Sequence, residues 1–174
     1  MVRGKFAGLS RLPARLMDRT PFNPLQAQEV AEAFNQADVE YLFIGKGGAI
    51  LLGFPGTTQD VVVFPAKSEE NGRRIVTALA GLGFELDETT RAEIVRGKDF
   101  VQLKSGPFDI DLVFAPDGIE SFEEAKARAV QEGQFPVANL RDIIASKKAA
   151  GRKKDRLDLE LLELFRLEYE ARNQ

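Results

Sequence analysis

Apolar residues recur along the chain with two different spacings, which separate the expected strands from the expected helices. Two short runs rich in β-branched and aromatic residues, 41–44 and 60–64, predict buried strands. Three glycines directly follow the first run and predict a sharp turn where the backbone can approach a ligand closely: Gly45, Gly47 and Gly48. Residues 49–52 then predict one or two helical turns, which Gly53 ends.

Two helices are predicted around these strands. Asn23 and Pro24 are typical of a helix start, and the helix is expected over about 25–35. Its inward positions are Leu25, Val30, Ala31 and Phe34. Ser68, followed by two glutamates, predicts the cap of a second helix over about 68–81. The inward positions of this second helix are Ile75, Leu79 and Leu82.

The middle of the chain has a strand-like pattern interrupted by turn residues. Strands are expected over 84–86, 92–95, 99–104 and 108–114. The last two are joined by Ser105-Gly106-Pro107, which predicts a hairpin.

The remainder is expected to be helical. Ser121 and Glu124 form the pattern of a capping box, which predicts a helix over about 121–132. After an extended link at 135–137, Asn139 is expected to start a helix that Gly151 ends. The last helix, about 154–172, has an apolar side made of Leu157, Leu161, Leu164, Phe165 and Leu167.

The pattern as a whole predicts an α+β fold with one mixed sheet and a helical C-terminal segment. A chain of 174 residues suits one domain with a small appendage. The expected division is a poorly ordered basic arm at 1–20, an α+β domain at 20–118 and a helical segment at 119–174 packed on that domain.

Composition removes several classes of chemistry. The chain contains no cysteine and no histidine, so disulfides, thiolate zinc sites, cysteine nucleophiles and serine–histidine hydrolysis are excluded. Any metal must therefore bind to carboxylates and other oxygens, which favours Mg²⁺ or Mn²⁺.

Apolar run lengths and charge bear on location and partners. No apolar run approaches the length of a membrane span, and the N-terminus lacks a signal-peptide core, so a cytoplasmic protein is expected. The net charge of −3 gives no overall attraction to nucleic acid, but basic residues gather in the first twenty positions and at 147–156. These two clusters are where an anionic partner is expected to dock.

Three acids are candidate metal ligands. Asp109 and Asp111 lie two apart in an expected strand and so share one face. The pair indicates either a divalent cation or a solvated face of an edge strand matched by Lys104 or an arginine. Asp60, at the start of the strand after the glycine turn, favours the metal. Carboxylates beside a glycine-rich turn are what metal-assisted phosphoryl or nucleotidyl transfer needs.

With these residues in place, the chain resembles the nucleotidyltransferase fold of the polymerase-β superfamily, in particular the minimal group that includes AbiEii-like toxin proteins. Residues 44–45, Gly53, Thr58, Asp60 and Asp111 match its motifs. The segment 143–158 is similar to the group's signature L-I-A-x-K-x-x-A-x-R-x-K-D-x-x-D. The resemblance covers about 25–170 and implies a nucleotidyltransferase-like fold.

The resemblance also implies roles for individual residues. Asp60 and Asp111, with Asp109 as an auxiliary, would hold Mg²⁺ or Mn²⁺ and act in catalysis. The triphosphate of an NTP would meet Gly45, Lys46, Gly47, Gly48, Thr58 and Lys147. Arg152, Asp155 and Asp158 would organise the junction between the last two helices.

Four positions depart from the pattern of the group. Lys46 stands where the group has the second Gly or Ser of the turn, Leu52 in place of a polar residue and Gly56 in place of an arginine. Val62 occupies the position of the second acid of Asp-x-Asp, so the motif is degenerate.

Three hypotheses follow. The first is a metal-dependent nucleotidyltransferase, weakened by Val62, that moves a nucleotidyl group from an NTP to a hydroxyl of an RNA end, a protein or a small molecule. The second is a catalytically silent relative that binds a nucleotide, RNA or a protein partner. The third is an RNA-binding protein that uses its basic arm.

Overall fold

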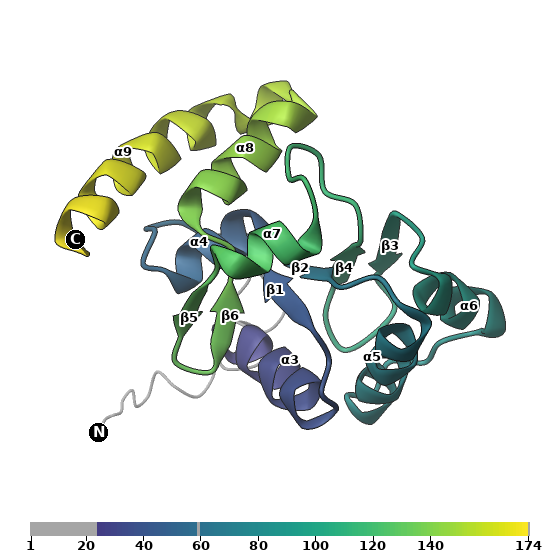
Figure 1. The fold of residues 1–174 in the computed structure, drawn as a ribbon. Coiled ribbons are helices and arrows are strands. Elements are labelled where there is room, and N and C mark those ends of the chain that lie inside the picture. Colours follow the sequence, from purple (N-terminus) through teal and green to yellow (C-terminus); the bar gives the residue numbers. More distant parts are fainter. Residues whose placement is uncertain (1–23, 59, 174) are drawn as a thin grey trace, which may run out of the picture.

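The computed structural model describes residues 24–58 and 60–173, and it confirms a mixed α+β architecture (Figure 1). The first half runs α3 (Pro24–Gln36), β1 (Tyr41–Phe43), α4 (Gly45–Leu51), β2 (Val61–Pro65), α5 (Glu69–Gly81), α6 (Glu88–Arg96), β3 (Phe100–Leu103) and β4 (Ile110–Val113). The second half runs α7 (Phe122–Ala127), β5 (Val130–Glu132), β6 (Phe135–Val137), α8 (Leu140–Ala150), the 3₁₀ turn η1 (Lys153–Asp155) and α9 (Arg156–Arg172). The predicted basic arm and the predicted cap Asn23 lie outside the described residues.

The strands of the described residues form one six-stranded sheet in the order β3-β4-β2-β1-β6-β5. The β2–β4 and β1–β6 pairs are parallel, while β1–β2, β3–β4 and β5–β6 are antiparallel. The predicted hairpin is therefore confirmed as β3–β4, in which Gln102 lies opposite Asp111. The sheet places the ends of β2 and β4 side by side, although 45 or more residues separate them in the sequence.

The two faces of the sheet differ in what covers them. One face carries Tyr41, Val61, Val63, Ile110 and Leu112, all buried, and the ring of Tyr41 packs edge-on against Phe34 of α3. On the opposite face, Phe64 packs against Phe122 of α7. Figure 1 accordingly shows α3, α5 and α6 on one side of the sheet and α7 and α8 on the other.

Local capping explains where several helices begin and end. The side chains of Ser68, Ser121 and Asn139 each accept a hydrogen bond from the backbone N–H three residues on, which satisfies a donor that the helix itself leaves open. Gly151 ends α8 with a φ of +63°, a left-handed conformation that a glycine adopts without steric cost. These starts and stops agree with the sequence predictions.

Two predicted strands in the middle of the chain are wrong. Residues 92–95 lie in α6, because Asp87 caps the Thr90 N–H at 2.8 Å and Gly97 closes the helix with a φ of +71°. Residues 84–86 form no strand; Phe84 is buried and packs edge-on against Phe108. The short apolar runs fit either spacing, and the caps and packing select the outcome.

The C-terminal half differs from prediction at two places. The helix expected over 121–132 ends at Ala127, because Val130–Glu132 pairs with β6 as a hairpin. The extended link at 135–137 is confirmed and is the strand β6. Most of the predicted apolar side of α9 is exposed: only Phe165 of its five residues is buried, together with Leu162, which was not predicted. In α3, Leu25 is likewise exposed instead of inward.

None of the helices in the described part of the chain combines the length and apolar character that a membrane crossing needs.

Candidate functional site

The candidate site lies on the face of the sheet opposite α3, along the row that crosses β2, β4 and β3. The strand register places Val62 beside Asp111 and Asp111 beside Gln102, so the three residues share one face. Asp111 is buried, with 8% of its surface exposed, whereas Gln102 on the edge strand β3 is exposed. Gln102 was not predicted; the register of the hairpin is the signal that identifies it.

Asp60 and Asp109 occupy the residues immediately before β2 and β4. The N–H of Val61 donates to the carbonyl oxygen of Asp109 at 3.4 Å, which holds the two strand starts together. The prediction that Asp109 and Asp111 share a strand is therefore wrong, because β4 begins at Ile110. The sheet nevertheless brings Asp60, Asp109 and Asp111 into one neighbourhood.

This proximity affects the pKa of Asp111. Burial, followed by the neighbouring charge of Asp60, raises the pKa of Asp111 above its ordinary value, and Asp109 acts in the same direction. Gln102 and Lys104 act in the opposite direction without cancelling the shift. Asp111 is thus a carboxylate in which burial and two like charges oppose ionisation.

One oxygen of Asp111 stands out. Its Oδ1 is buried and has no hydrogen-bond partner among the described residues. A buried carboxylate oxygen without a partner is costly, because the desolvation of the group is not compensated. Such an atom requires an explanation, because nearly all buried polar atoms in folded proteins have a partner, and a bound cation is one possible partner.

Gly45 connects this row to α4. Ile44, just before it, donates its N–H to the carbonyl of Val62 at 3.0 Å. Gly45 has a φ of +71°, and a Cβ placed on it would lie 3.6 Å from the Cβ of Val62. The start of α4 therefore sits over Val62, in the row of Asp111.

The other predicted turn glycines have a different setting. The short helix predicted before Gly53 is confirmed, but it begins at Gly45 instead of Ala49, so Gly47 and Gly48 are buried inside α4 and do not form a turn before it. A Cβ on Gly48 would lie 3.1 Å from the backbone oxygen of Phe43 and 3.4 Å from the side chain of Ile143. Gly48 thus permits the close packing of α4 against β1 and α8.

Lys46 connects α4 to the start of α9. Its Nζ lies 3.3 Å from Asp158, and both side chains are about three-quarters buried, at 23% and 25% exposure. A Cβ on Gly56 would lie 3.3 Å from the Cε of Lys46, so the loop before β2 packs against the same side chain.

Lys147 forms part of a second ionic group at the junction of α8 and α9. Its Nζ lies 3.3 Å from Asp155, whose other oxygen accepts from the Nε of Arg152 at 2.7 Å. Burial acts to raise the pKa of Asp155, but the hydrogen bond from Arg152 and the charge of Lys147 outweigh it and hold the pKa below its usual value. Arg152 and Asp155 form an ion pair at this junction, as expected, whereas Asp158 pairs with Lys46 of α4 and not with a residue of the junction.

Thr58 is half-buried in the loop that leads to Asp60, and the residue between them lies outside the described part.

The other predicted site residues fall into a carboxylate group at β2 and β4 and a basic group at α4 and α8, joined through Gly45 and Val62.

The carboxylate group fits a cation only in part. Across 24–58 and 60–173, no three Asp or Glu side chains converge so as to hold a metal ion by themselves. Mg²⁺, however, is usually bound through one or two carboxylates, with water and substrate phosphates completing the octahedron. Asp60 and Asp111 match that smaller requirement, while Val62 offers no oxygen.

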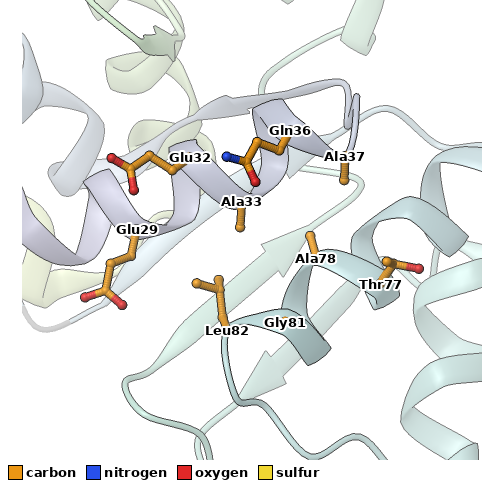
Figure 2. Close-up of a pocket in the computed structure, with 9 residues that line it drawn as sticks. All are labelled: Glu29, Glu32, Ala33, Gln36, Ala37, Thr77, Ala78, Gly81 and Leu82. Carbon is orange, nitrogen blue, oxygen red and sulfur yellow. The ribbon is translucent and has the colours of Figure 1, made fainter.

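A groove that could take a ligand lies elsewhere. It has a volume of about 470 Å³ and runs between α3 and α5, on the other side of the sheet (Figure 2). Figure 2 shows the small side chains of Ala33 and Ala37 on α3 facing that of Ala78 on α5, and Glu29 and Glu32 of α3 also line the groove. None of the predicted site residues lines it.

Comparison with known proteins adds no assignment. No protein-family model matches the chain, and no curated protein matches it.

Proposed function

We propose that this protein binds a nucleoside triphosphate together with Mg²⁺ and that it is a nucleotidyltransferase whose transfer step is weakened by Val62. The observation that carries the proposal is the buried, unpartnered Oδ1 of Asp111, next to the charges of Asp60 and Asp109. The motif resemblance at Gly45, Asp60 and Asp111 supports the choice of an NTP as ligand.

The carboxylate group at β2 and β4 and the basic group at α4 and α8 would have different roles. Asp60 and Asp111 would hold the cation, with Asp109 beside them, and Gly45 would leave room above Val62. Lys46 and Lys147 carry the positive charge that suits a triphosphate, and in the absence of ligand each is paired with an aspartate. The bound Mg²⁺ would stabilise the charge that develops on the leaving pyrophosphate. The acceptor would be a hydroxyl of an RNA, a protein or a small molecule.

Val62 favours a second candidate function, a catalytically silent NTP-binding protein. In two-metal nucleotidyl transfer, two carboxylates of the same strand bridge the two metal ions. Here Val62, opposite Asp111, occupies the position of one of these carboxylates and offers no oxygen. The pairing of Lys46 and Lys147 with internal acids agrees with a site that has lost its reaction.

Calorimetric titration of each NTP, with and without Mg²⁺, tests the binding. The expected result is Mg²⁺-dependent binding that weakens by about tenfold or more in Asp111→Asn, because the variant removes a ligand charge. Asp117→Asn is the matched control, since Asp117 is an exposed aspartate outside the site. An NTP affinity that does not depend on Mg²⁺, or that is the same in Asp111→Asn and Asp117→Asn, would contradict the role of Asp111 in holding Mg²⁺.

Label transfer from radioactive NTPs to total RNA or protein separates the two functions. A nucleotidyltransferase transfers label in the natural chain, and Val62→Asp increases the rate. A silent NTP-binding protein shows Mg²⁺-dependent binding without transfer in the natural chain.

A further inference from the structure

Phe100 on the edge strand β3 presents an aromatic ring to solvent beside the candidate site. It is 47% exposed, and it is the one aromatic among the large apolar side chains that are exposed in the described residues. No ring contact joins it to another aromatic side chain in that part of the chain. A single exposed apolar residue is ordinary in a folded protein, so its significance depends on what lies on the same face.

The strand register places Phe100 on the same face of the sheet as Asp111. In the β3–β4 pair, Gln102 lies directly opposite Asp111. Phe100 precedes Gln102 by two residues and points to the same side, while Val101 between them is buried. Phe100 and Asp111 are therefore diagonal neighbours across one strand pair. Such neighbours are about 7–8 Å apart, within reach of an aromatic side chain.

The exposed positions of β3 continue this face toward the carboxylates. Phe100 and Gln102 are exposed and alternate with buried residues. Lys104 follows in the same alternation, and its charge is close enough to oppose the rise in the pKa of Asp111. The face thus offers a ring, an amide and a cation beside the candidate site, three groups that suit a nucleoside and the phosphate next to it.

The basic group of the candidate site lies on the other side of the carboxylates. Lys46 belongs to α4, which packs on β2, β6 and α8, and Lys147 belongs to α8. In the sheet, β4 and β3 lie on the opposite side of β2 from β1 and β6. Figure 1 accordingly shows β3 on the side away from α4 and α8. An NTP that directs its phosphates to these lysines and shares a cation with Asp111 therefore extends its base toward β3.

We propose that the outward face of β3 is the base subsite of the NTP site, with the ring of Phe100 stacked on the nucleobase and Gln102 beside it. This inference rests on the proposed function and assigns the part of the ligand that the carboxylates and lysines do not contact. Stacking on one ring tolerates all four bases, because every base has a π-face.

Calorimetric titration of ATP and of inorganic triphosphate, each with Mg²⁺, separates the contribution of the base from that of the phosphates. Phe100→Leu keeps an apolar side chain but removes the ring. It is expected to weaken ATP binding by about fivefold or more and to leave the binding of inorganic triphosphate unchanged. Phe100→Tyr keeps the ring and is expected to bind ATP like the natural chain. Leu167→Ala, an exposed apolar change on α9, is the control.

The outcomes of this titration distinguish the base subsite from the proposed function. An ATP affinity that is the same in Phe100→Leu and in the natural chain overturns the base subsite and leaves the proposed function standing. An equal loss of affinity for ATP and for inorganic triphosphate also overturns the subsite, because the loss then does not come from the base. A natural chain that binds neither ligand with Mg²⁺ overturns the proposed function and the subsite with it.

Photolabelling locates the base without any substitution. The probe is an azido derivative of ATP with the photoreactive group on the base, used with Mg²⁺. Trypsin cleaves after Lys98 and Lys104, so residues 99–104 are released as one peptide. The label is expected on this peptide, and an excess of ATP is expected to prevent it. Labelling confined to peptides from other segments overturns the inference.

Discussion

Asp111 and Asp155 are both buried aspartates, yet their surroundings act on them in opposite ways. Asp155 faces Lys147 and Arg152, which stabilise its ionised form. Asp111 faces Asp60 and Asp109 and keeps one oxygen without a partner, so its ionised form is disfavoured. A structural aspartate is normally placed like Asp155, whereas the setting of Asp111 is typical of functional sites.

Replacing Asp111 by asparagine is expected to stabilise the protein in the absence of ligand. Because the folded-state pKa is raised, the natural chain loses stability as the pH rises from the ordinary aspartate pKa of 3.8 through the folded value. The variant carries no charge at this position and escapes this loss, so it should be more stable at pH 7 by about 1 kcal/mol, the usual scale of a single substitution.

Urea unfolding of both chains at neutral pH and at about pH 3, where aspartates are protonated, checks this expectation. The difference should be present at neutral pH and nearly absent in acid. A variant that is less stable at neutral pH would mean that Asp111 makes a stabilising contact when ionised.

At the scale of elements, the packing of α5 against α6 depends on Gly72. A Cβ there would lie 2.6 Å from the Cα of Val95 and 2.8 Å from the carbonyl oxygen of Ile94, both backbone atoms that cannot rotate away. Asn71 next to it anchors the start of α5 through hydrogen bonds to the backbone of Glu40 and Ala66. The two helices are therefore fixed at short distance by one small residue.

Gly72→Ala is expected to destabilise the fold by about 2 kcal/mol, within the usual range for overpacking a tight contact. Gly81→Ala, in the same helix, is the control, because a Cβ at Gly81 meets nothing within 4 Å. There the better helix propensity of alanine should raise stability by about 0.5 kcal/mol. Thermal unfolding of the two variants distinguishes the effects. An equal loss of stability in both variants would show that α6 does not pack closely against Gly72.

At the scale of the whole molecule, the ion pair of Lys46 with Asp158 joins the glycine-rich helix near one end of the chain to α9 at the other. The pair is partly exposed, so its contribution to stability is expected to be under about 1 kcal/mol. Its larger consequence is that Asp158 competes for the lysine that the proposed triphosphate would use.

Asp158→Asn is therefore expected to strengthen NTP binding a few-fold, on the order of 1 kcal/mol at most, while changing the melting temperature little. Calorimetric titration measures the affinity, and Glu123→Gln, an exposed change of the same charge on α7, is the control. Weaker binding in Asp158→Asn would instead show that the ion pair positions Lys46 for the ligand.

The sequence by itself determined the features whose cause is local. The caps at Ser68, Ser121 and Asn139, the stop at Gly151 and the β3–β4 hairpin depend on hydrogen bonds and φ angles within a few residues. The α+β class followed from the order of such elements. The candidate acids were selected by residue type, because a chain without cysteine or histidine can bind a metal ion only through oxygen ligands.

Only the tertiary structure decided what depends on distant neighbours. Residues 92–95 are helical, and Val95 there packs against Gly72 of α5. Periodicity showed that α9 is apolar but not which of its two apolar sides is covered, because burial is set by the helix that packs against it. The row of Val62, Asp111 and Gln102 likewise exists only through the pairing of three strands. Burial and neighbouring charge, which give Asp111 its character, are properties of that assembled sheet.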